Sequence, residues 1–226
     1  MGLTVRAAVF ASGRGSNFEV LARHPGDGWE VALLVTDRAD AVAVERAVTL
    51  GVPHQVVSVS GRSSQEIAHE LLPLLETAGI DLILLAGYLR LVPAPVVEAF
   101  AGRILNVHPA LLPGFGGKGM FGLNVHAAVL AAGVRVTGVT VHRVGLSYDD
   151  GPILAQWPVP VHPGDTPERL ARRVAAVEHR LFPAVVDRVA QALSGRSGPQ
   201  ALPDPIPGGG AADTFILTAT PPKDFP

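Results

Sequence analysis

The sequence predicts a doubly wound α/β fold, in which a mostly parallel, seven-stranded sheet carries helices on both faces. Short apolar runs alternate along the chain with segments of helical periodicity, and this alternation favours right-handed strand–helix–strand crossovers. Several of the runs, such as the segment 81–86 "DLILLA", are apolar at nearly every position instead of at every second one. That pattern is typical of strands that are covered on both faces.

Each element is predicted from its own stretch of sequence. The β-branched and apolar runs predict strands over 5–10, 31–36, 55–59, 81–86, 103–107, 136–142 and 153–159. Apolar residues at helical spacing predict helices over 16–24, 40–50, 64–78, 94–100, 124–132 and 166–193.

The 226 residues suit one large domain, which we place at residues 1–195. From residue 196 to 226 the chain becomes dense in Gly and Pro, as in a linker or tail. The segment 214–220 "TFILTAT" could form one strand, either docked on the sheet edge or exchanged with a neighbouring copy. An exchanged strand would make the protein a homodimer.

Composition excludes several function classes. The net charge is −2, with 18 Lys and Arg against 20 Asp and Glu, so we expect no nucleic-acid partner. The chain contains no run of about 18 apolar residues, so we expect no membrane partner. Cysteine is absent, which excludes disulfides and thiolate sites and suits a cytoplasmic location. The eight histidines lack metal-binding spacing, so no metal is expected.

The segment "SGRGSN", 12–17, follows the first predicted strand and opens the first predicted helix. Glycines in such a turn bring backbone N–H groups close to a ligand, and a helix N-terminus favours an anion. The dinucleotide and P-loop patterns are both incomplete, which leaves a site for one phosphate monoester at Gly15, Ser16 and Asn17. The alternative is a plain strand–helix turn capped by Ser16.

The segment "NVHP", 106–109, ends the fifth predicted strand with polar side chains. Alternation along a strand places Asn106 and His108 on one face, and Pro109 keeps His108 extended. Both could hydrogen-bond a developing oxyanion at the carboxyl end of the sheet. The alternative is a strand-end histidine bonded to backbone, with the asparagine in a turn.

Three other features bear on a site. The loop "DDGP", 149–152, could supply a carboxylate that orients His108, or could be an ordinary Asp-Gly turn. The segment "LAGYLRLV", 85–92, could wall an apolar cleft or be ordinary core. In the last predicted helix, apolar residues at helical spacing put Glu178 on the buried side, where a carboxylate needs a partner.

Taken together, these motifs resemble one family. The segments "SGRGSN", "LAGYLRLV", "RILNVHPALLP", "DDGPILAQ" and "VEHRLFP" occur in the order seen in the phosphoribosylglycinamide formyltransferase family, the glycinamide ribonucleotide transformylases of purine synthesis. The resemblance covers about residues 5–190 and implies a Rossmann-like formyltransferase fold.

The resemblance implies transfer of a formyl group from 10-formyltetrahydrofolate, as co-substrate, to the amine of glycinamide ribonucleotide. It implies that Asn106, His108 and Asp149 are catalytic, with Asn106 and protonated His108 stabilising the oxyanion and Asp149 holding His108 charged. Gly15, Ser16 and Asn17 would bind the substrate phosphate, and Glu178 would hold its amine. The folate would contact Leu89, Arg90, Leu91, Val92, Asn106, Gly145, Leu146, Ser147, Tyr148 and Asp149.

The sequence departs from the family at two positions. Where the family often has a folate-side Arg, this chain has Gln65, with Arg62 nearby. Where a Gln often precedes the family's glutamate by three residues, this chain has Ala175. The segment 114–126 resembles a longer loop variant, in which Lys118 could help to bind an anion.

Three alternatives to the transferase remain. A formyltetrahydrofolate hydrolase would use water as acceptor, and usually carries an N-terminal regulatory domain that we do not expect before a first strand at residue 5. A methionyl-tRNA formyltransferase would need a further C-terminal domain and a basic surface. A non-catalytic nucleotide or folate-binding module would bind ligand without formyl transfer.

Overall fold

The computed structural model describes residues 4–26 and 28–195. Its centre is a seven-stranded sheet in the order β3-β2-β1-β4-β5-β6-β7. The first five strands in this order are parallel, and β6 runs antiparallel to both β5 and β7. The strands are β1 (Val5–Phe10), β2 (Trp29–Thr36), β3 (His54–Val56), β4 (Leu82–Leu85), β5 (Ile104–His108), β6 (Val136–Arg143) and β7 (Ile153–Pro160).

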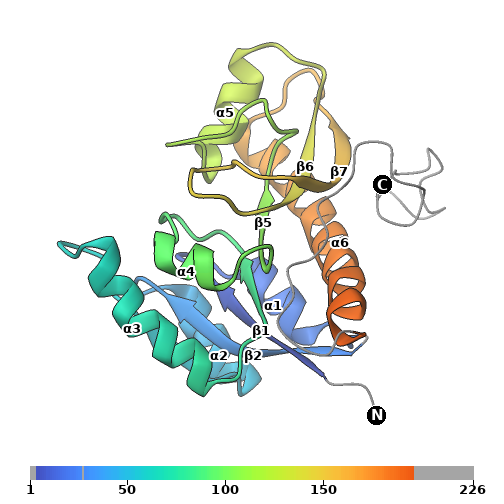
Figure 1. Ribbon diagram of the computed structural model, residues 1–226. Helices are drawn as coiled ribbons and strands as arrows, with labels where there is room; N and C mark the ends of the chain where they lie inside the picture. The colour runs from blue at the N-terminus through green and yellow to red at the C-terminus, as the bar shows by residue number, and fades with distance from the viewer. Residues whose placement is uncertain (1–3, 27, 196–226) are drawn as a thin grey trace.

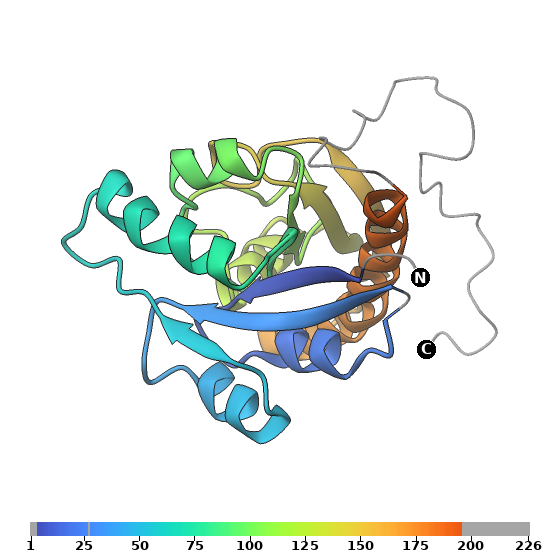
Figure 2. The same ribbon diagram turned by 60° about the horizontal axis from the view of Figure 1, so that its bottom comes forward.

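Helices cover the sheet on both faces (Figures 1 and 2). They are α1 (Ser16–Arg23), α2 (Val42–Leu50), α3 (Ser64–Thr77), α4 (Ala94–Ala99), α5 (Leu123–Ala131) and α6 (Pro167–Ser194). One hydrophobic cluster joins the sheet to α1, α2, α5 and α6, and a second joins the opposite face to α3 and α4. The sheet therefore forms the middle of three layers, as the sequence predicts.

β4 is apolar throughout, and β1 is apolar except at Arg6, because both faces of these central strands are buried. Phe10 and the residues of β4 up to Leu84 have no exposed surface. Alternate residues belong to the two hydrophobic clusters, so that Leu84 packs on the α6 side and Ile83 on the α3 side. Burial of this kind stabilises by roughly 1.5–3 kcal/mol for each large side chain.

The fold class and every predicted strand and helix of the described residues are confirmed, with ends that shift by up to three residues. The largest change is in β3, which ends at Val56 instead of residue 59. It is an edge strand, and only β2 pairs with it. The predicted strand at 214–220 lies outside the described residues. Within those residues, none of the helices combines the length and apolar character needed to cross a membrane.

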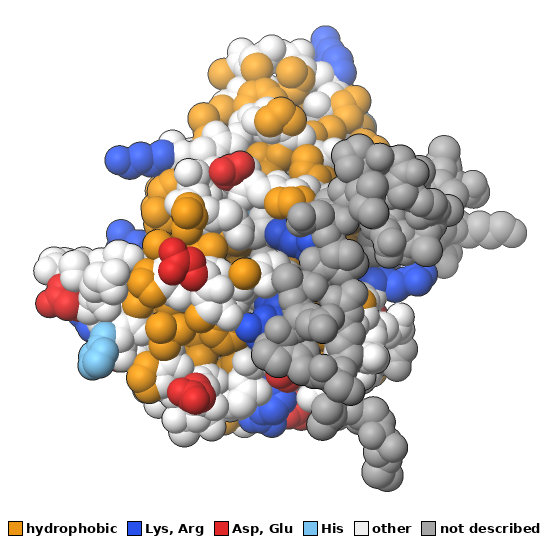
Figure 3. All heavy atoms as spheres, in the orientation of Figure 1, with side chains coloured by type: hydrophobic (Ala, Val, Ile, Leu, Met, Phe, Trp, Pro, Cys, Tyr) orange, Lys and Arg blue, Asp and Glu red, His pale blue; other side chains and the backbone are white. Residues whose placement is uncertain are grey.

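Charged side chains of both signs are interspersed with apolar areas on the face seen in Figure 3.

The candidate functional site lies at the carboxyl ends of the parallel strands. There β1, β4 and β5 lead into loops that begin at Ala11, Ala86 and Pro109. The antiparallel register of β6 places His142 directly beside Asn106 and Thr140 beside His108.

Candidate active site

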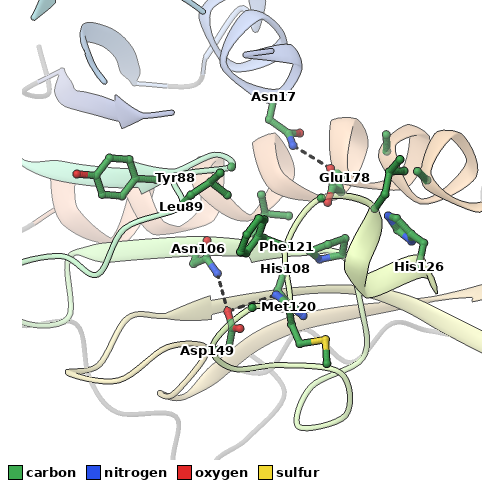
Figure 4. A pocket seen from close by; sticks show the side chains of 18 of the residues that line it. Asn17, Tyr88, Leu89, Asn106, His108, Met120, Phe121, His126, Asp149 and Glu178 are labelled. Atoms are coloured by element: carbon green, nitrogen blue, oxygen red, sulfur yellow. Dashed lines mark hydrogen bonds and ion pairs between the residues drawn. The ribbon is translucent and has the colours of Figure 1, made fainter. Parts of the chain in front are cut away.

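A cavity of about 950 Å³ lies at the carboxyl ends of β1, β4 and β5. Its walls come from the loops that follow these strands, from the glycine-rich segment 117–122, from the loop before β7, and from one face of α6. Figure 4 shows that side chains from all of these segments converge on one space. The sequence-predicted residues Asn17, Asn106, His108, Asp149 and Glu178 all line it.

The cavity brings together two segments that are distant in the sequence. Nδ1 of His108 lies 3.3 Å from Oδ1 of Asp149, and the amide Nδ2 of Asn106 donates to the same oxygen at 3.3 Å. His108 is only 3% exposed. A histidine and a carboxylate buried together in this way form the core of an acid–base or oxyanion-stabilising site.

Asp149 is held by its backbone as well as by His108. Its φ of 52° lies in the left-handed region, which aspartate tolerates better than most residues. The backbone N–H of Gly117 donates to its Oδ2 at 2.7 Å. Burial favours the neutral acid, but the hydrogen bond and charge of His108 and the Gly117 N–H outweigh it, and the pKa of Asp149 falls below its ordinary value. The carboxylate is therefore ionised at neutral pH.

Both ring nitrogens of His108 have acceptors. Nε2 lies 2.8 Å from the carbonyl oxygen of Phe115, which can only accept a hydrogen bond, and Nδ1 faces the carboxylate of Asp149. This arrangement suits a doubly protonated imidazolium. Phe115 has a φ of 56°, so the segment that supplies this carbonyl adopts a conformation that is rare for non-glycine residues.

Asn106 has a second partner that the sequence did not reveal. Its Nδ2 lies 3.0 Å from Nε2 of His142, and Nδ1 of His142 lies 2.8 Å from the carbonyl oxygen of Arg143. The carbonyl requires the proton on Nδ1. Burial lowers the pKa of His142, so Nε2 keeps its lone pair and accepts from Asn106.

Glu178 lies on the face of α6 that lines the cavity and is 9% exposed. Asn17 Nδ2 donates to its Oε2 at 2.9 Å, which connects the first turn of α1 to α6 (Figure 4). Burial raises the pKa of Glu178, although the hydrogen bond from Asn17 and the charge of His108 partly oppose the shift. A buried carboxylate with one protein donor is suited to receive a cationic or N–H-bearing ligand group.

The turn before α1 is built around Gly15. This residue is the N-cap of α1, with a φ of 69°, and no side chain makes a capping hydrogen bond there. Ser16 is the first helical residue, so it does not cap the helix as the plain-turn alternative required. The first N–H groups of α1 are left without a side-chain cap and are available to an anion beside Asn17.

Gly15 also permits a close approach between α1 and α2. A Cβ atom built on Gly15 would lie 2.8 Å from Cα of Ala43. We therefore predict that Gly15→Ala displaces the turn and raises KM for a phosphate-bearing substrate by a factor on the order of ten or more. Gly13→Ala is the matched control, because its Cβ meets no atom within 4 Å. Equal KM values for the two variants would contradict a role of the turn in binding.

The predicted folate residues divide into two groups. Leu89, Asn106, Tyr148 and Asp149 line the cavity. The structure places the other predicted residues outside its lining: Arg90, Leu91, Val92, Gly145, Leu146 and Ser147.

Arg90 and Val92 have contacts that explain their positions. Nε of Arg90 donates to Oδ2 of Asp37 at 2.7 Å, and the side chain of Asp37 is 1% exposed. Val92 is 3% exposed and belongs to the cluster between the sheet and α3. Direct side-chain contact of these residues with a ligand therefore remains a prediction.

The residues at which the sequence departs from the family lie partly in the cavity lining and partly outside it. Ala175 lines the cavity between Glu178 and Arg172, and Lys118 lines it from the glycine-rich segment. Arg62 lies elsewhere, where its guanidinium bonds to Glu70 and to backbone oxygens. Gln65 is exposed on α3.

Sequence reasoning missed several lining residues, namely Arg14, Met120, Phe121, His126 and Arg172. Spacing on α6 could have indicated Arg172, which shares a face with Ala175 and Glu178. His126 is 4% exposed, and burial together with the charge of His108 lowers its pKa to about 4. The described residues contain no group of three or more side chains that could hold a metal ion.

Residues 5–186 match the model of the formyl transferase family. The chain belongs to the formyl transferase family. Among its curated relatives, the chloroplastic phosphoribosylglycinamide formyltransferase of Arabidopsis thaliana is 46% identical over 191 residues, which cover 82% of this chain and 65% of that protein. The phosphoribosylglycinamide formyltransferase of Bacillus subtilis (strain 168) is 37% identical over 188 residues, covering 80% of this chain and 93% of the relative.

The formyl transferase fold is also evident in solved structures. The glycinamide ribonucleotide transformylase 1 of Symbiobacterium toebii superimposes with a TM-score of 0.79 at 40% identity, covering 85% of this chain and 90% of that one. The chain spans only 65% and 61% of the two plant relatives, from Arabidopsis thaliana and Vigna unguiculata.

Proposed function

We propose that this formyl transferase moves the formyl group of 10-formyltetrahydrofolate to the amine of glycinamide ribonucleotide, a step of de novo purine synthesis. The observation that carries the proposal is a single cavity whose lining includes His108, Asp149 and Glu178, together with Arg14 and Asn17 from the turn that leads into α1. The names of the Arabidopsis and Bacillus relatives, and of the Symbiobacterium structure, support the same reaction.

The chemistry requires charge stabilisation at one carbon. The neutral amine of the nucleotide attacks the formyl carbon, and a tetrahedral intermediate forms with negative charge on oxygen and positive charge on nitrogen. His108, charged beside Asp149, stabilises the oxyanion. The attacking nitrogen then loses a proton, with Asp149 as acceptor through water, while the leaving folate nitrogen gains one from His108, and the carbon–nitrogen bond to folate breaks.

The rest of the cavity holds the substrates in place. The N–H groups at the start of α1 bind the phosphate, and Glu178 binds the amine end. Leu89 and Tyr148 provide partly exposed apolar surface for the folate, beside Asn106. Holding both reactants in one geometry supplies a large part of the rate enhancement in a reaction of this type.

We infer that the partners are these two small molecules, with no metal, nucleic acid or membrane. A homodimer is part of the same proposal, and measurement of the size of the full chain in solution tests it. The composition favours the cytoplasm, while the plant relatives are chloroplastic.

The main alternative of the same fold is a hydrolase that passes the formyl group to water. The Glu178–Asn17 contact beside an uncapped helix N-terminus favours the transferase, because water as acceptor needs neither an anion site nor an amine site. A non-catalytic binding module does not require the buried His108–Asp149 pair.

An assay with 10-formyltetrahydrofolate, run with and without glycinamide ribonucleotide, tests the proposal. We expect formylated nucleotide and deformylated folate to appear together, and only when the nucleotide is present. Deformylation at the same rate without nucleotide would identify a hydrolase. Binding of both compounds without any product would identify a binding module.

A further inference from the structure

The first residue of the glycine-rich turn before α1, Ser12, has no place in the cavity lining. Arg14 and Asn17 of the same turn line the cavity, whereas Ser12 does not. Its side chain is buried, with only 2% of the residue exposed. A buried hydroxyl destabilises the fold unless it is hydrogen-bonded, so the partners of Ser12 indicate which part of the molecule it serves.

Both hydrogen bonds of Ser12 go to the loop that follows β4. Its backbone N–H donates to the carbonyl oxygen of Gly87 at 3.1 Å, and its Oγ accepts from the backbone N–H of Leu89 at 3.0 Å. The parallel pairing of β1 with β4 ends where Phe10 lies beside Leu85. Ser12 therefore continues the contact between the two segments beyond the ends of the strands, and its side chain makes the outermost bond.

The loop that Ser12 holds forms one wall of the cavity. Gly87, Tyr88 and Leu89 all belong to the lining, and Figure 4 shows the side chains of Tyr88 and Leu89 beside it. Gly87 has a φ of 74°, so the chain turns sharply there. The ring of Tyr88 packs edge-on against Phe10, with 5.3 Å between the ring centroids. Leu89 follows with 37% of its surface exposed, and the Ser12 hydroxyl fixes the direction of its backbone.

The turn before α1 is held by other contacts, which do not involve the hydroxyl. The carbonyl oxygen of Gly13 accepts from the backbone N–H of Ala43 at 3.0 Å. The carbonyl oxygen of Arg14 accepts from Nε of Arg46 at 2.8 Å. Both bonds join the turn to α2 and would survive removal of the Ser12 Oγ, as would the backbone bond to the β4 loop. The hydroxyl therefore serves the cavity wall and not the turn to which it belongs in sequence.

We propose that Ser12 is a positioning residue for the folate: its hydroxyl orients the backbone of Leu89 and so holds in place the apolar surface that the formyl folate contacts. This inference rests on the proposed function. Arg90 provides a second anchor for the same segment, because its Nε donates to the buried Asp37. A wall that is fixed before binding lowers the entropy that the ligand must otherwise remove by ordering the loop.

Calorimetric titration of each substrate alone tests the proposal in the full chain. We expect Ser12→Ala to raise the Kd for 10-formyltetrahydrofolate by a factor on the order of ten, and to leave the Kd for glycinamide ribonucleotide within about threefold of the wild type. Ser12→Cys fills nearly the same space with a sulfur that accepts only weakly, so it should show most of the same loss. This variant separates the hydrogen bond from the volume of the side chain.

Ser63→Ala is the matched control. The Oγ of Ser63 also accepts from a backbone N–H, that of Glu66 at 3.3 Å, but it does so at the start of α3 and outside the cavity lining. Its loss should leave both Kd values unchanged. An unchanged folate Kd in Ser12→Ala would overturn the proposal. So would equal weakening of both substrates in that variant, or wild-type folate affinity in Ser12→Cys.

Amide hydrogen exchange of the unliganded chain gives a readout that needs no substrate. In Ser12→Ala the Leu89 amide should exchange faster by about tenfold or more, while the Ala86 amide, which donates to the carbonyl oxygen of Phe10 at 2.9 Å, should keep its rate. Unchanged exchange at Leu89 would overturn the positioning role, whatever the chain binds. Faster exchange at Leu89 in a chain whose wild type does not bind 10-formyltetrahydrofolate would instead overturn the folate role together with the proposed function.

Discussion

Replacement of His108 with alanine is expected to lower kcat by a factor on the order of 10² or more. The imidazole lies in the cavity between Asp149 and the carbonyl oxygen of Phe115, and in the proposed reaction it stabilises the oxyanion. Binding of the nucleotide should change little, because its proposed phosphate and amine contacts are at the turn before α1 and at Glu178, away from His108. Steady-state kinetics with each substrate varied in turn measures both quantities.

The control for this variant is His69→Ala, which changes an exposed histidine on α3 far from the cavity lining. It should leave kcat unchanged. If His108→Ala retained wild-type turnover while His69→Ala did the same, the proposed catalytic role of the His108–Asp149 pair would be wrong. The chain would then be better described as a binding module.

Glu178→Gln is expected to weaken catalysis and to stabilise the fold at the same time. Glutamine keeps an oxygen that can accept from Asn17, but it removes the charge that the substrate amine would meet. A hydrogen bond to a charged group contributes about 1.5–3 kcal/mol, so kcat/KM for the nucleotide should fall by a factor on the order of 10 to 100. KM for the folate should stay close to that of the wild type.

The stability gain follows from the raised pKa of Glu178. The folded state favours the neutral acid, so the contribution of Glu178 to stability is most favourable at acid pH and falls as pH rises from the unfolded pKa through the higher folded one. Glutamine does not lose a proton, so the variant avoids this decrease. At neutral pH we therefore expect Glu178→Gln to unfold at a higher Tm than the wild type.

Thermal unfolding over a series of pH values measures this effect. The difference in Tm between Glu178→Gln and the wild type should grow from acid to neutral pH. Glu76→Gln, at an exposed position on α3, should show no such trend. A lower Tm for Glu178→Gln at neutral pH would contradict the assignment of Glu178 as a carboxylate whose burial destabilises the folded state.

Local sequence patterns predicted most of the fold because the relevant forces are local or periodic. β4 is apolar throughout since both of its faces are covered, and helical spacing alone placed Glu178 on the buried side of α6. Alternation in β5 correctly put Asn106 and His108 on the side of the cavity. The predicted meeting of His108 with Asp149 depended on the family resemblance.

The contacts that sequence could not predict depend on register and on side-chain direction. His142 reaches Asn106 only because β6 runs antiparallel to β5 in one particular register. Arg90 turns to the buried carboxylate of Asp37 instead of into the cavity. The Phe115 carbonyl meets His108 through a segment in which a non-glycine residue has a positive φ.

The central claim is that one cavity binds the phosphate at the start of α1 and presents the amine to the His108–Asp149 pair. A crystal structure of the chain with glycinamide ribonucleotide tests it most directly. We predict phosphate oxygens on the backbone N–H groups of the turn at Gly15 to Asn17, and the amine nitrogen within hydrogen-bond distance of Glu178. A nucleotide bound with its phosphate away from that turn, or with its amine outside the cavity, would contradict the account.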